Sequence, residues 1–179
     1  MMVSVSIFSI VMVMAVGALL SIVDANRKAQ GQQNTFDNLD SVLENMSRNI
    51  RVGTYYRCIP GAYSNASIET PQDCLSPGGA AFAFESNVGA SGNPNDQIIY
   101  RLNGTQIERS VNGGTTFVPM TSPEIIIDGL TFYVRGSSPL PNTLQSTVVI
   151  SLYGHVGTNA KTRVDFNLQT TITQRLFDI

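Results

Sequence analysis

The sequence predicts an α+β protein in which a long N-terminal helix, transmembrane at first and then amphipathic, packs on an antiparallel β-sheet. Residues 1–23 form an uncharged apolar run, residues 36–50 carry an apolar stripe at helical spacing, and apolar residues alternate from about residue 97 onward. The first two patterns are typical of helices, and the third is typical of strands with one buried face. We therefore expect three parts, residues 1–23, 24–53 and 54–179.

The first 23 residues contain four serines and no charged side chain. A helix of this length spans about 35 Å at a rise of about 1.5 Å per residue, enough to cross a hydrocarbon layer of about 30 Å. A cleaved secretion signal is the alternative, but its apolar region is shorter, about 7–15 residues, and follows basic residues. The run therefore predicts a membrane helix that stays on the protein.

The remaining residues are enough for one domain, and their composition is polar but weakly charged. The formal net charge of the chain is −2, and only 13% of its residues are charged. A nucleic-acid-binding face normally needs clustered Lys and Arg, so we expect no such partner. The abundance of Asn, Ser, Thr, Gln and Gly favours an extracytoplasmic domain.

An amphipathic helix is predicted after the apolar run, because apolar residues recur in steps of three and four. The stripe consists of Phe36, Leu39, Leu43, Met46 and Ile50. Thr35, or else Gln33 or Asn34, is expected to cap its start. Gly53 is expected to end it in a left-handed conformation. Only one Gly and no Pro separate the stripe from the apolar run, so both can belong to one continuous helix.

The β-rich part is expected to begin with a loop over residues 55–79, which contains three prolines. Alternation then predicts strands over 97–102, 105–111, 116–119, 130–135, 148–152 and 164–173. The Asn103-Gly104 pair predicts a two-residue hairpin turn between the first two strands. The helical stripe is expected to cover the apolar face of the resulting sheet.

Cys58 and Cys74 flank fifteen residues rich in Pro, Gly, Ser and Asn. A metal site would need three or four ligands, and no further Cys or nearby His is present. A disulfide that closes the loop 58–74 is the simpler interpretation, with two free and unrelated thiols as the alternative. Such a disulfide would contribute about 3 kcal/mol and would indicate an oxidising compartment.

The sequence gives two contradictory indications of how the membrane helix is oriented. Arg27 and Lys28 follow the apolar run, which by the positive-inside rule would put the following domain in the cytoplasm. The cysteines and the polar composition indicate the opposite side. The two indications agree only if basic residues precede Met1.

No catalytic or cofactor-binding residue is predicted, and we expect no enzyme activity. His155 is the single His of the chain and is expected to be a solvent-facing turn residue. The run Asn93–Asp96 offers oxygens that could hold a structural calcium ion. It has fewer carboxylates than a dedicated calcium site, and turn chemistry explains the same residues.

Three stretches of the chain resemble the type IV pilin and type II secretion pseudopilin superfamily. MMVSVSIFSIVMVMAVGALLSIVDANRKAQ resembles the segment that follows the family's characteristic glutamate. LENMSRNIRVG (Leu43–Gly53) looks like the end of the long helix in J-type minor pseudopilins and related bacterial prepilin-like proteins. FNLQTTITQR (Phe166–Arg175) is similar to the terminal strand of the same group. The architecture resembles the family over the whole chain.

The resemblance implies a filament subunit that is stored in the membrane and assembles through its N-terminal helix. Small residues let neighbouring helices approach closely in lipid. The residues expected to form the assembly helix surface are Val5, Phe8, Val11, Ala15, Gly17, Ala18 and Ile22. The implied partners are membrane lipid, other pilin or pseudopilin subunits, the assembly platform and the prepilin peptidase. The implied location is the cell membrane, single-pass, with the C-terminal domain extracytoplasmic, and the cell surface or periplasm after assembly.

The chain departs from the family pattern at its beginning. Family members have a basic leader that ends in Gly, a methylated first mature residue and a Glu at the fifth mature position. This prepilin cleavage site is not present in the chain, and no acidic residue precedes Asp24. The resemblance therefore implies that the glutamate falls just upstream of Met1 or Met2. We expect the sequence as given to insert into membranes but to assemble poorly, and an upstream-extended form to assemble.

Two other functions stay open at the level of sequence. One is a membrane-tethered extracytoplasmic binding domain that does not polymerise, and the other is an envelope enzyme with a convergent polar site. An upstream reading frame with a basic-Gly-aromatic-x-x-x-Glu pattern would favour the filament subunit, and a stop codon just before Met1 would favour the tethered domain. The sequence does not distinguish a pilus from a secretion pseudopilus, or a role in adhesion, motility, DNA uptake or secretion.

Overall fold

The computed structural model describes residues 2–61, 70–90, 93–137, 144–157 and 163–175. It forms two compact units, Met1–Asp37 and Asn38–Ile179, which are described separately below. The elements are α1 (Met2–Val52), β1 (Thr54–Ile59), β2 (Cys74–Gly79), β3 (Ala81–Glu85), β4 (Ile98–Asn103), β5 (Gln106–Ser110), β6 (Val118–Pro119), β7 (Ile125–Arg135), β8 (Thr147–Val156) and β9 (Val164–Thr173).

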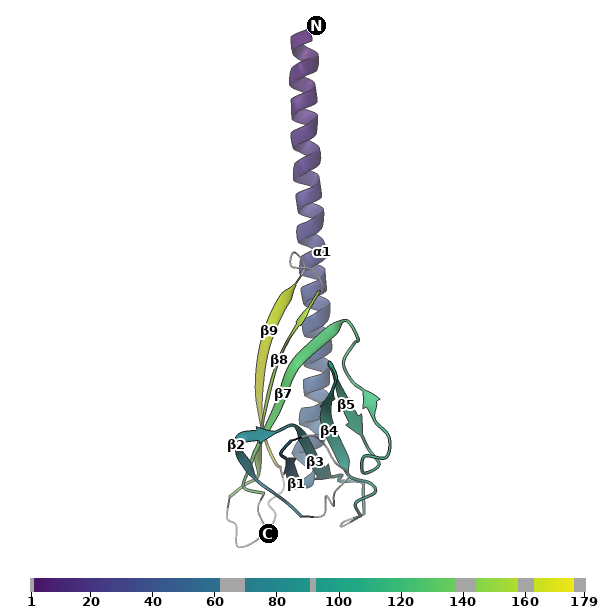
Figure 1. The fold of residues 1–179 in the computed structure, drawn as a ribbon, viewed down its shortest axis with the longest axis vertical. Coiled ribbons are helices and arrows are strands. Elements are labelled where there is room, and N and C mark those ends of the chain that lie inside the picture. Colours follow the sequence, from purple (N-terminus) through teal and green to yellow (C-terminus); the bar gives the residue numbers. More distant parts are fainter. Residues whose placement is uncertain (1, 62–69, 91–92, 138–143, 158–162, 176–179) are drawn as a thin grey trace. The chain divides into compact units, whose positions relative to one another are not determined.

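The predicted fold class is confirmed, but the strands form two antiparallel sheets instead of one. One sheet has the order β1-β3-β4-β5-β6, and the other has the order β2-β7-β8-β9. Figure 1 shows the long strands β7, β8 and β9 side by side, with the shorter strands β3, β4 and β5 in the second sheet. All strand pairs within both sheets are antiparallel.

The strand β9 has the bounds and the alternation that the sequence predicts. Phe166 and Ile172 are buried on one face, whereas Asp165 and Asn167 are exposed on the other. The clean alternation reflects a strand with one face toward the core and one toward solvent. Leu168, in the middle of the inward face, is only half-buried.

The prediction of a loop over residues 55–79 is wrong. Both ends of this stretch are strands, β1 and β2, and β3 follows directly. Pro77 is tolerated in β2 because this strand lies at the edge of its sheet and pairs only with β7. β1 is a short strand in which Tyr56 and Cys58 are buried, a pattern too brief to stand out among turn residues.

The helix α1 is continuous from Met2 to Val52, as its lack of breakers suggested. The expected cap at Thr35 is wrong, because Thr35 lies inside the helix and its Oγ1 donates to the Gly31 carbonyl at 2.7 Å. Gly53 follows the helix but is not left-handed. Instead Tyr55 has a positive φ of 52°, where β1 shifts its register against β3.

Gly53 is required for a steric reason. A Cβ at this position would lie 2.3 Å from Cδ2 of Phe84, far inside van der Waals contact. The backbone at the end of α1 therefore packs directly on an aromatic ring of β3. The expected left-handed conformation is therefore wrong, and the glycine is needed because Phe84 approaches the backbone closely.

The part of α1 within the second unit contributes one face to the hydrophobic core. Leu39, Val42, Met46 and Ile50 are buried among residues of both sheets. The predicted stripe needs correction, because Leu43 is only half-buried and Val42 takes its place in the core. Phe36 belongs to the first unit and is 44% exposed.

Aromatic rings fill the centre of this core. Phe82 of β3 stacks on Phe132 of β7, and Phe84 stacks on Tyr100 of β4. Tyr56 of β1 meets both phenylalanines of β3 edge to face. Because these rings come from both sheets, the two sheets and residues 38–52 of α1 share one core.

Carbonyl groups at the end of α1 and just after it accept hydrogen bonds from groups outside the helix. The Tyr56 hydroxyl donates to the Ile50 carbonyl, and the Arg175 amide donates to the Arg51 carbonyl at 2.9 Å. The Gln174 side chain donates to the carbonyl of Gly53 at 3.1 Å. Helix ends leave carbonyls without partners inside the helix, so these contacts stabilise the junction between helix and sheets.

Candidate functional site

The first candidate site is the apolar segment at the start of α1. Among the described residues, α1 is the one helix long and apolar enough to cross a membrane, and its most apolar window is not buried by the rest of the protein. Residues 2–23 are all exposed, with Met2 at 89% and Val13 at 73%. A helix that is apolar on every side needs apolar surroundings, so this segment is suited to anchor the protein in a membrane.

The serines of this segment are compatible with a lipid environment. The hydroxyl of Ser6 donates to the carbonyl of Met2, and the hydroxyl of Ser9 donates to that of Val5, both at 2.9 Å. Polar groups in hydrocarbon are costly unless they have internal partners. These two hydroxyls satisfy their donors inside the helix.

The residues expected to form the assembly surface do not all lie on one side of α1. Steps of three and four residues place one set on a common face. This set consists of Phe8, Val11, Ala15, Ala18 and Ile22, and we call it the small-residue face. Val5 lies at its edge. Gly17 is about 100° from Ala18 and about 160° from Ala15, and therefore lies on another side.

The two alanines and Gly17 differ in their position on the helix. Ala15 and Ala18 sit in the middle of the small-residue face, between larger apolar side chains on either end. No atom of this chain lies within 4 Å of where a Gly17 Cβ would be, so the fold itself does not require a glycine there. Small residues such as these let neighbouring helices approach closely in lipid.

Cys58 and Cys74 form a disulfide, with Cα atoms 5.8 Å apart. Cys58 belongs to β1 of one sheet and Cys74 to β2 of the other, so the bond links the two sheets covalently. Cys58 is fully buried, and a Cβ on Gly79 would lie 2.2 Å from its sulfur. Most of the intervening loop, residues 62–69, lies outside the described residues.

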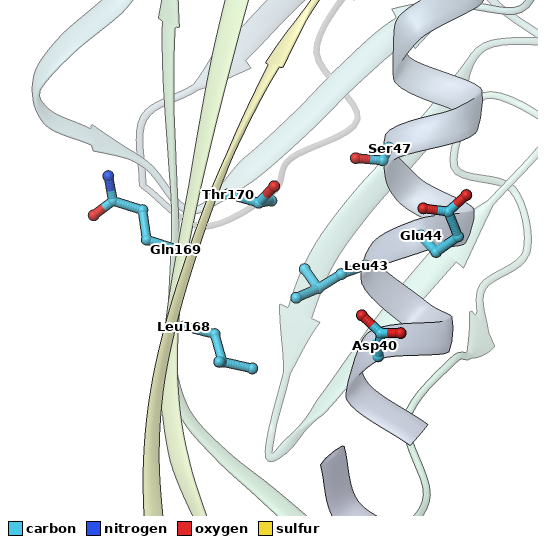
Figure 2. A pocket seen from close by; sticks show the side chains of 7 residues that line it. All are labelled: Asp40, Leu43, Glu44, Ser47, Leu168, Gln169 and Thr170. Carbon is cyan, nitrogen blue, oxygen red and sulfur yellow. The ribbon is translucent and has the colours of Figure 1, made fainter. Parts of the chain in front are cut away.

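A pocket of about 250 Å³ lies between α1 and the edge strand β9 (Figure 2). Figure 2 shows Leu43 and Leu168 pointing toward one another across it, while Gln169 points away from the helix. Its lining residues are Asp40, Leu43, Glu44, Ser47, Leu168, Gln169 and Thr170. Glu44 forms an ion pair with Arg48 at 3.1 Å. The lining thus combines two leucines with the Ser47 hydroxyl and the carboxyls of Asp40 and Glu44.

His155 is not the turn residue that the sequence predicts. It lies within β8, its side chain is mostly buried, and its Nδ1 is 2.8 Å from Oδ2 of Asp128. Asp128 sits where β7 shifts register against β8. The pair links the side chains of the neighbouring strands β7 and β8.

The loop at 93–96 makes the turn contacts that its composition suggests. Asn93 Oδ1 accepts from the amide of Asn95 at 3.2 Å, and Asp96 Oδ2 accepts from the amide of Ala90 at 2.8 Å. The described residues contain no group of three His, Cys, Asp or Glu side chains arranged to hold a metal ion. Sequence reasoning missed Glu85, a buried carboxyl that lies beside Asp96 and has no periodic signal of its own.

Comparisons with protein families, curated proteins and solved structures find no match to this chain. The long apolar helix, the antiparallel sheets and the disulfide are consistent with a pilin-like architecture. The argument for function therefore depends on α1 and on the β-rich unit into which it continues.

Proposed function

We propose that the chain is a membrane-anchored, pilin-like filament subunit, either a minor pilin or a pseudopilin of the J type. One observation carries this proposal. The helix α1 is apolar and exposed on all sides over residues 2–23, and its later residues Leu39, Met46 and Ile50 enter the core of a β-rich unit. The first segment needs apolar surroundings, which both a membrane and the core of a helical filament supply.

Assembly would exchange lipid for neighbouring helices on the same surface. Subunits that contact one another head to tail through two different surfaces form open helical assemblies, and two sides of the exposed helix can provide those surfaces. The partners in this proposal are membrane lipid and other pilin or pseudopilin subunits, with the assembly platform and prepilin peptidase implied by the family resemblance. The proposal assigns no catalytic step and no nucleic-acid partner.

We place the β-rich unit on the extracytoplasmic side, and at the cell surface or in the periplasm after assembly. The disulfide Cys58–Cys74 supports this side, because disulfides persist in oxidising compartments. Arg27 and Lys28 favour the opposite side by the positive-inside rule. A basic leader ahead of Met1 would outweigh them, and its presence is part of the test.

The first experiment is mass spectrometry of the N-terminus of the protein isolated from its native envelope. We expect a methylated residue several positions upstream of Met1, with a glutamate in fifth place. An unmodified chain that begins at Met1 or Met2 would contradict prepilin processing and would favour the membrane-tethered binding domain instead.

A second experiment tests assembly itself. Single cysteines replace Ala15 or Ala18 in a C58A/C74A background, and oxidation in the native membrane is followed by gel electrophoresis. A filament subunit should give ladders of cross-linked species that require the assembly platform. A tethered domain should stay monomeric, or should give dimers that do not depend on the platform.

A further inference from the structure

Glu85 is a buried carboxyl at the end of β3. The residue is only 3% exposed, and its Oε2 accepts a long hydrogen bond of 3.4 Å from Nε2 of Gln97. Its other oxygen, Oε1, is buried and accepts no hydrogen bond in the described part of the chain. A buried carboxylate oxygen without a donor is costly, so this atom requires an explanation.

Asp96 presents a second such oxygen from the loop before β4. Its Oδ2 accepts from the Ala90 amide at 2.8 Å and from the Asn93 side chain at 3.1 Å, which fixes the orientation of the carboxylate. Its Oδ1 is buried and, within the described ranges, accepts no hydrogen bond. Each carboxylate therefore has one oxygen that accepts a hydrogen bond and one oxygen that has no donor among the described residues.

The two carboxylates converge beside Gly89. A Cβ on this glycine would lie 2.9 Å from Oε1 of Glu85 and 3.1 Å from Oδ2 of Asp96, so a larger residue would occupy the space between them. The ion pairs recorded among the described residues involve neither Glu85 nor Asp96. The two carboxyl groups thus lie within hydrogen-bond reach of one another, and none of the ion pairs in the described part of the chain supplies them with a counter-charge.

We propose that Glu85 and Asp96 form a binding site for one calcium ion, held between Oε1 of Glu85 and Oδ1 of Asp96. Hard cations prefer carboxylate oxygens, and a divalent cation balances the charge of two carboxylates. Calcium tolerates an irregular ligand set completed by water, whereas magnesium demands near-ideal octahedral geometry. The loop composition alone offered one carboxylate, and Glu85 supplies the second from a different element.

The site does not depend on whether the protein forms filaments. Glu85 is the register partner of Thr54, the first residue of β1, which follows the end of α1 by two residues. A bound ion would join the end of β3 to the loop before β4, close to the junction of helix and sheets. We expect calcium to stabilise the fold rather than to take part in a reaction.

A proton is the competing occupant of the same position. Burial, followed by the charge of Asp96, raises the pKa of Glu85, while the Ala90 amide holds the pKa of Asp96 below its ordinary value. A protonated Glu85 could donate to Asp96 and remove the repulsion without a cation. The experiment must therefore separate calcium from acid.

The test is thermal unfolding of the full chain in detergent micelles, followed by far-UV circular dichroism at pH 7.5 (about two units above the usual titration range of carboxyls). CaCl2 is compared with MgCl2 and with EDTA. For an affinity in the range of about 10⁻⁴–10⁻³ M, as in extracellular calcium modules, Tm should rise by about 3–5 °C at ten times Kd. Equilibrium dialysis with radioactive calcium should find one ion per chain.

Isosteric variants identify the ligands. Glu85→Gln and Asp96→Asn should lose the calcium-dependent shift and the bound ion, and in EDTA Glu85→Gln should unfold at a higher temperature than the wild type, because one buried charge is gone. Glu44→Gln and Asp165→Asn are matched controls at exposed ion pairs and should respond to calcium like the wild type.

Several results would overturn the site. One is a wild-type Tm that is equal in CaCl2 and EDTA, and another is a calcium shift in Glu85→Gln as large as that of the wild type. A wild type that is stabilised only by acid, with no bound calcium by dialysis, would assign the position to a proton and reject the proposal.

Discussion

At the scale of single residues, the contacts around Gly53 show how one missing side chain sets the junction between helix and sheet. The Phe84 ring occupies the space that a Cβ would need, so Gly53→Ala must displace either the ring or the end of α1. Overpacking of this kind typically costs about 1–3 kcal/mol. We expect Gly53→Ala to lower the free energy of unfolding by this amount in urea titrations of the detergent-solubilised chain.

The control for this prediction is Gly31→Ala. No atom lies within 4 Å of a Cβ at Gly31, which sits in the exposed part of α1, and alanine favours a helix by up to about 1 kcal/mol over glycine. This variant should leave the unfolding midpoint of the β-rich unit unchanged. Equal effects of the two substitutions would contradict the steric explanation.

A second prediction at the junction concerns Tyr56, because its buried hydroxyl donates to the carbonyl of Ile50. Tyr56→Phe removes this donor, although the carbonyl still accepts from the Gly53 amide at 3.1 Å, and should cost about 0.5–1.5 kcal/mol of unfolding free energy. The neighbouring Tyr55→Phe provides a matched control, since Tyr55 is 46% exposed. Unfolding midpoints that fall equally in both variants would argue against a specific role for the Tyr56 hydroxyl.

From the buried carboxyl of Glu85 we predict that the stability of the fold depends on pH in calcium-free solution. Burial raises its pKa above the ordinary 4.5, so the folded state holds this proton more tightly than the unfolded state. The resulting stabilisation is fully present below pH 4.5 and is lost as the pH rises through the raised pKa. Asp96 acts oppositely, because its pKa is lowered and its contribution is lost only as the pH falls through that lower value.

Urea unfolding across this pH range measures the effect. The stability of the wild type in EDTA should fall, relative to Glu85→Gln, as the pH is raised from 4.5 toward neutrality. Among the described residues, the side chains that shift the pKa of Glu85 are those of Gln97 and Asp96, and neither brings a positive charge that would reverse this sign. A constant difference between the two proteins across the range would refute the assignment.

At the scale of elements, the disulfide is a covalent cross-link between two sheets that also share a hydrophobic core and a hydrogen bond from the Ile127 amide to the Thr105 carbonyl at 3.0 Å. It joins β1 to β2, which belong to different sheets. Replacing both partners in C58A/C74A should lower the free energy of unfolding by about 2–5 kcal/mol. Reduced wild-type protein should show a similar loss in the same urea titration, and an unchanged midpoint in both would show that non-covalent contacts alone hold the sheets together.

At the scale of the whole molecule, the proposed assembly predicts that two sides of α1 respond differently to enlargement. A15L/A18L fills the middle of the small-residue face, whereas G17L adds the same side chain elsewhere on the exposed segment. Closely packed helices tolerate added bulk poorly. With the reporter cysteine moved to Ile22, we expect A15L/A18L to reduce platform-dependent cross-linking by at least about tenfold (about 1.4 kcal/mol), and G17L to reduce it far less.

Membrane insertion serves as the control for that comparison. Both variants keep residues 2–23 apolar, so both should resist alkaline extraction from membranes as the wild type does. Equal loss of cross-linking in both variants would show that helix packing does not centre on Ala15 and Ala18. Loss of membrane association would point to a folding defect instead.

The amino-acid sequence by itself determined the features whose signals are local and periodic. The unbroken apolar run at the start of α1, the end of the helix at Val52, and the alternation of β9 all follow from spacing along one element. A Cys58–Cys74 disulfide was the simpler of two interpretations, because the chain has only two cysteines, and the structure confirms the bond. Each of these signals repeats over many residues or leaves few alternatives.

Only the tertiary structure decided features that join distant segments. It divided the strands into two sheets, placed Val42 in the core where Leu43 was expected, and showed that Gly53 is required by the Phe84 ring. It also brought Glu85 to Asp96 across the loop between β3 and β4. These outcomes depend on which surfaces meet in three dimensions, and periodicity along the chain carries no information about that choice.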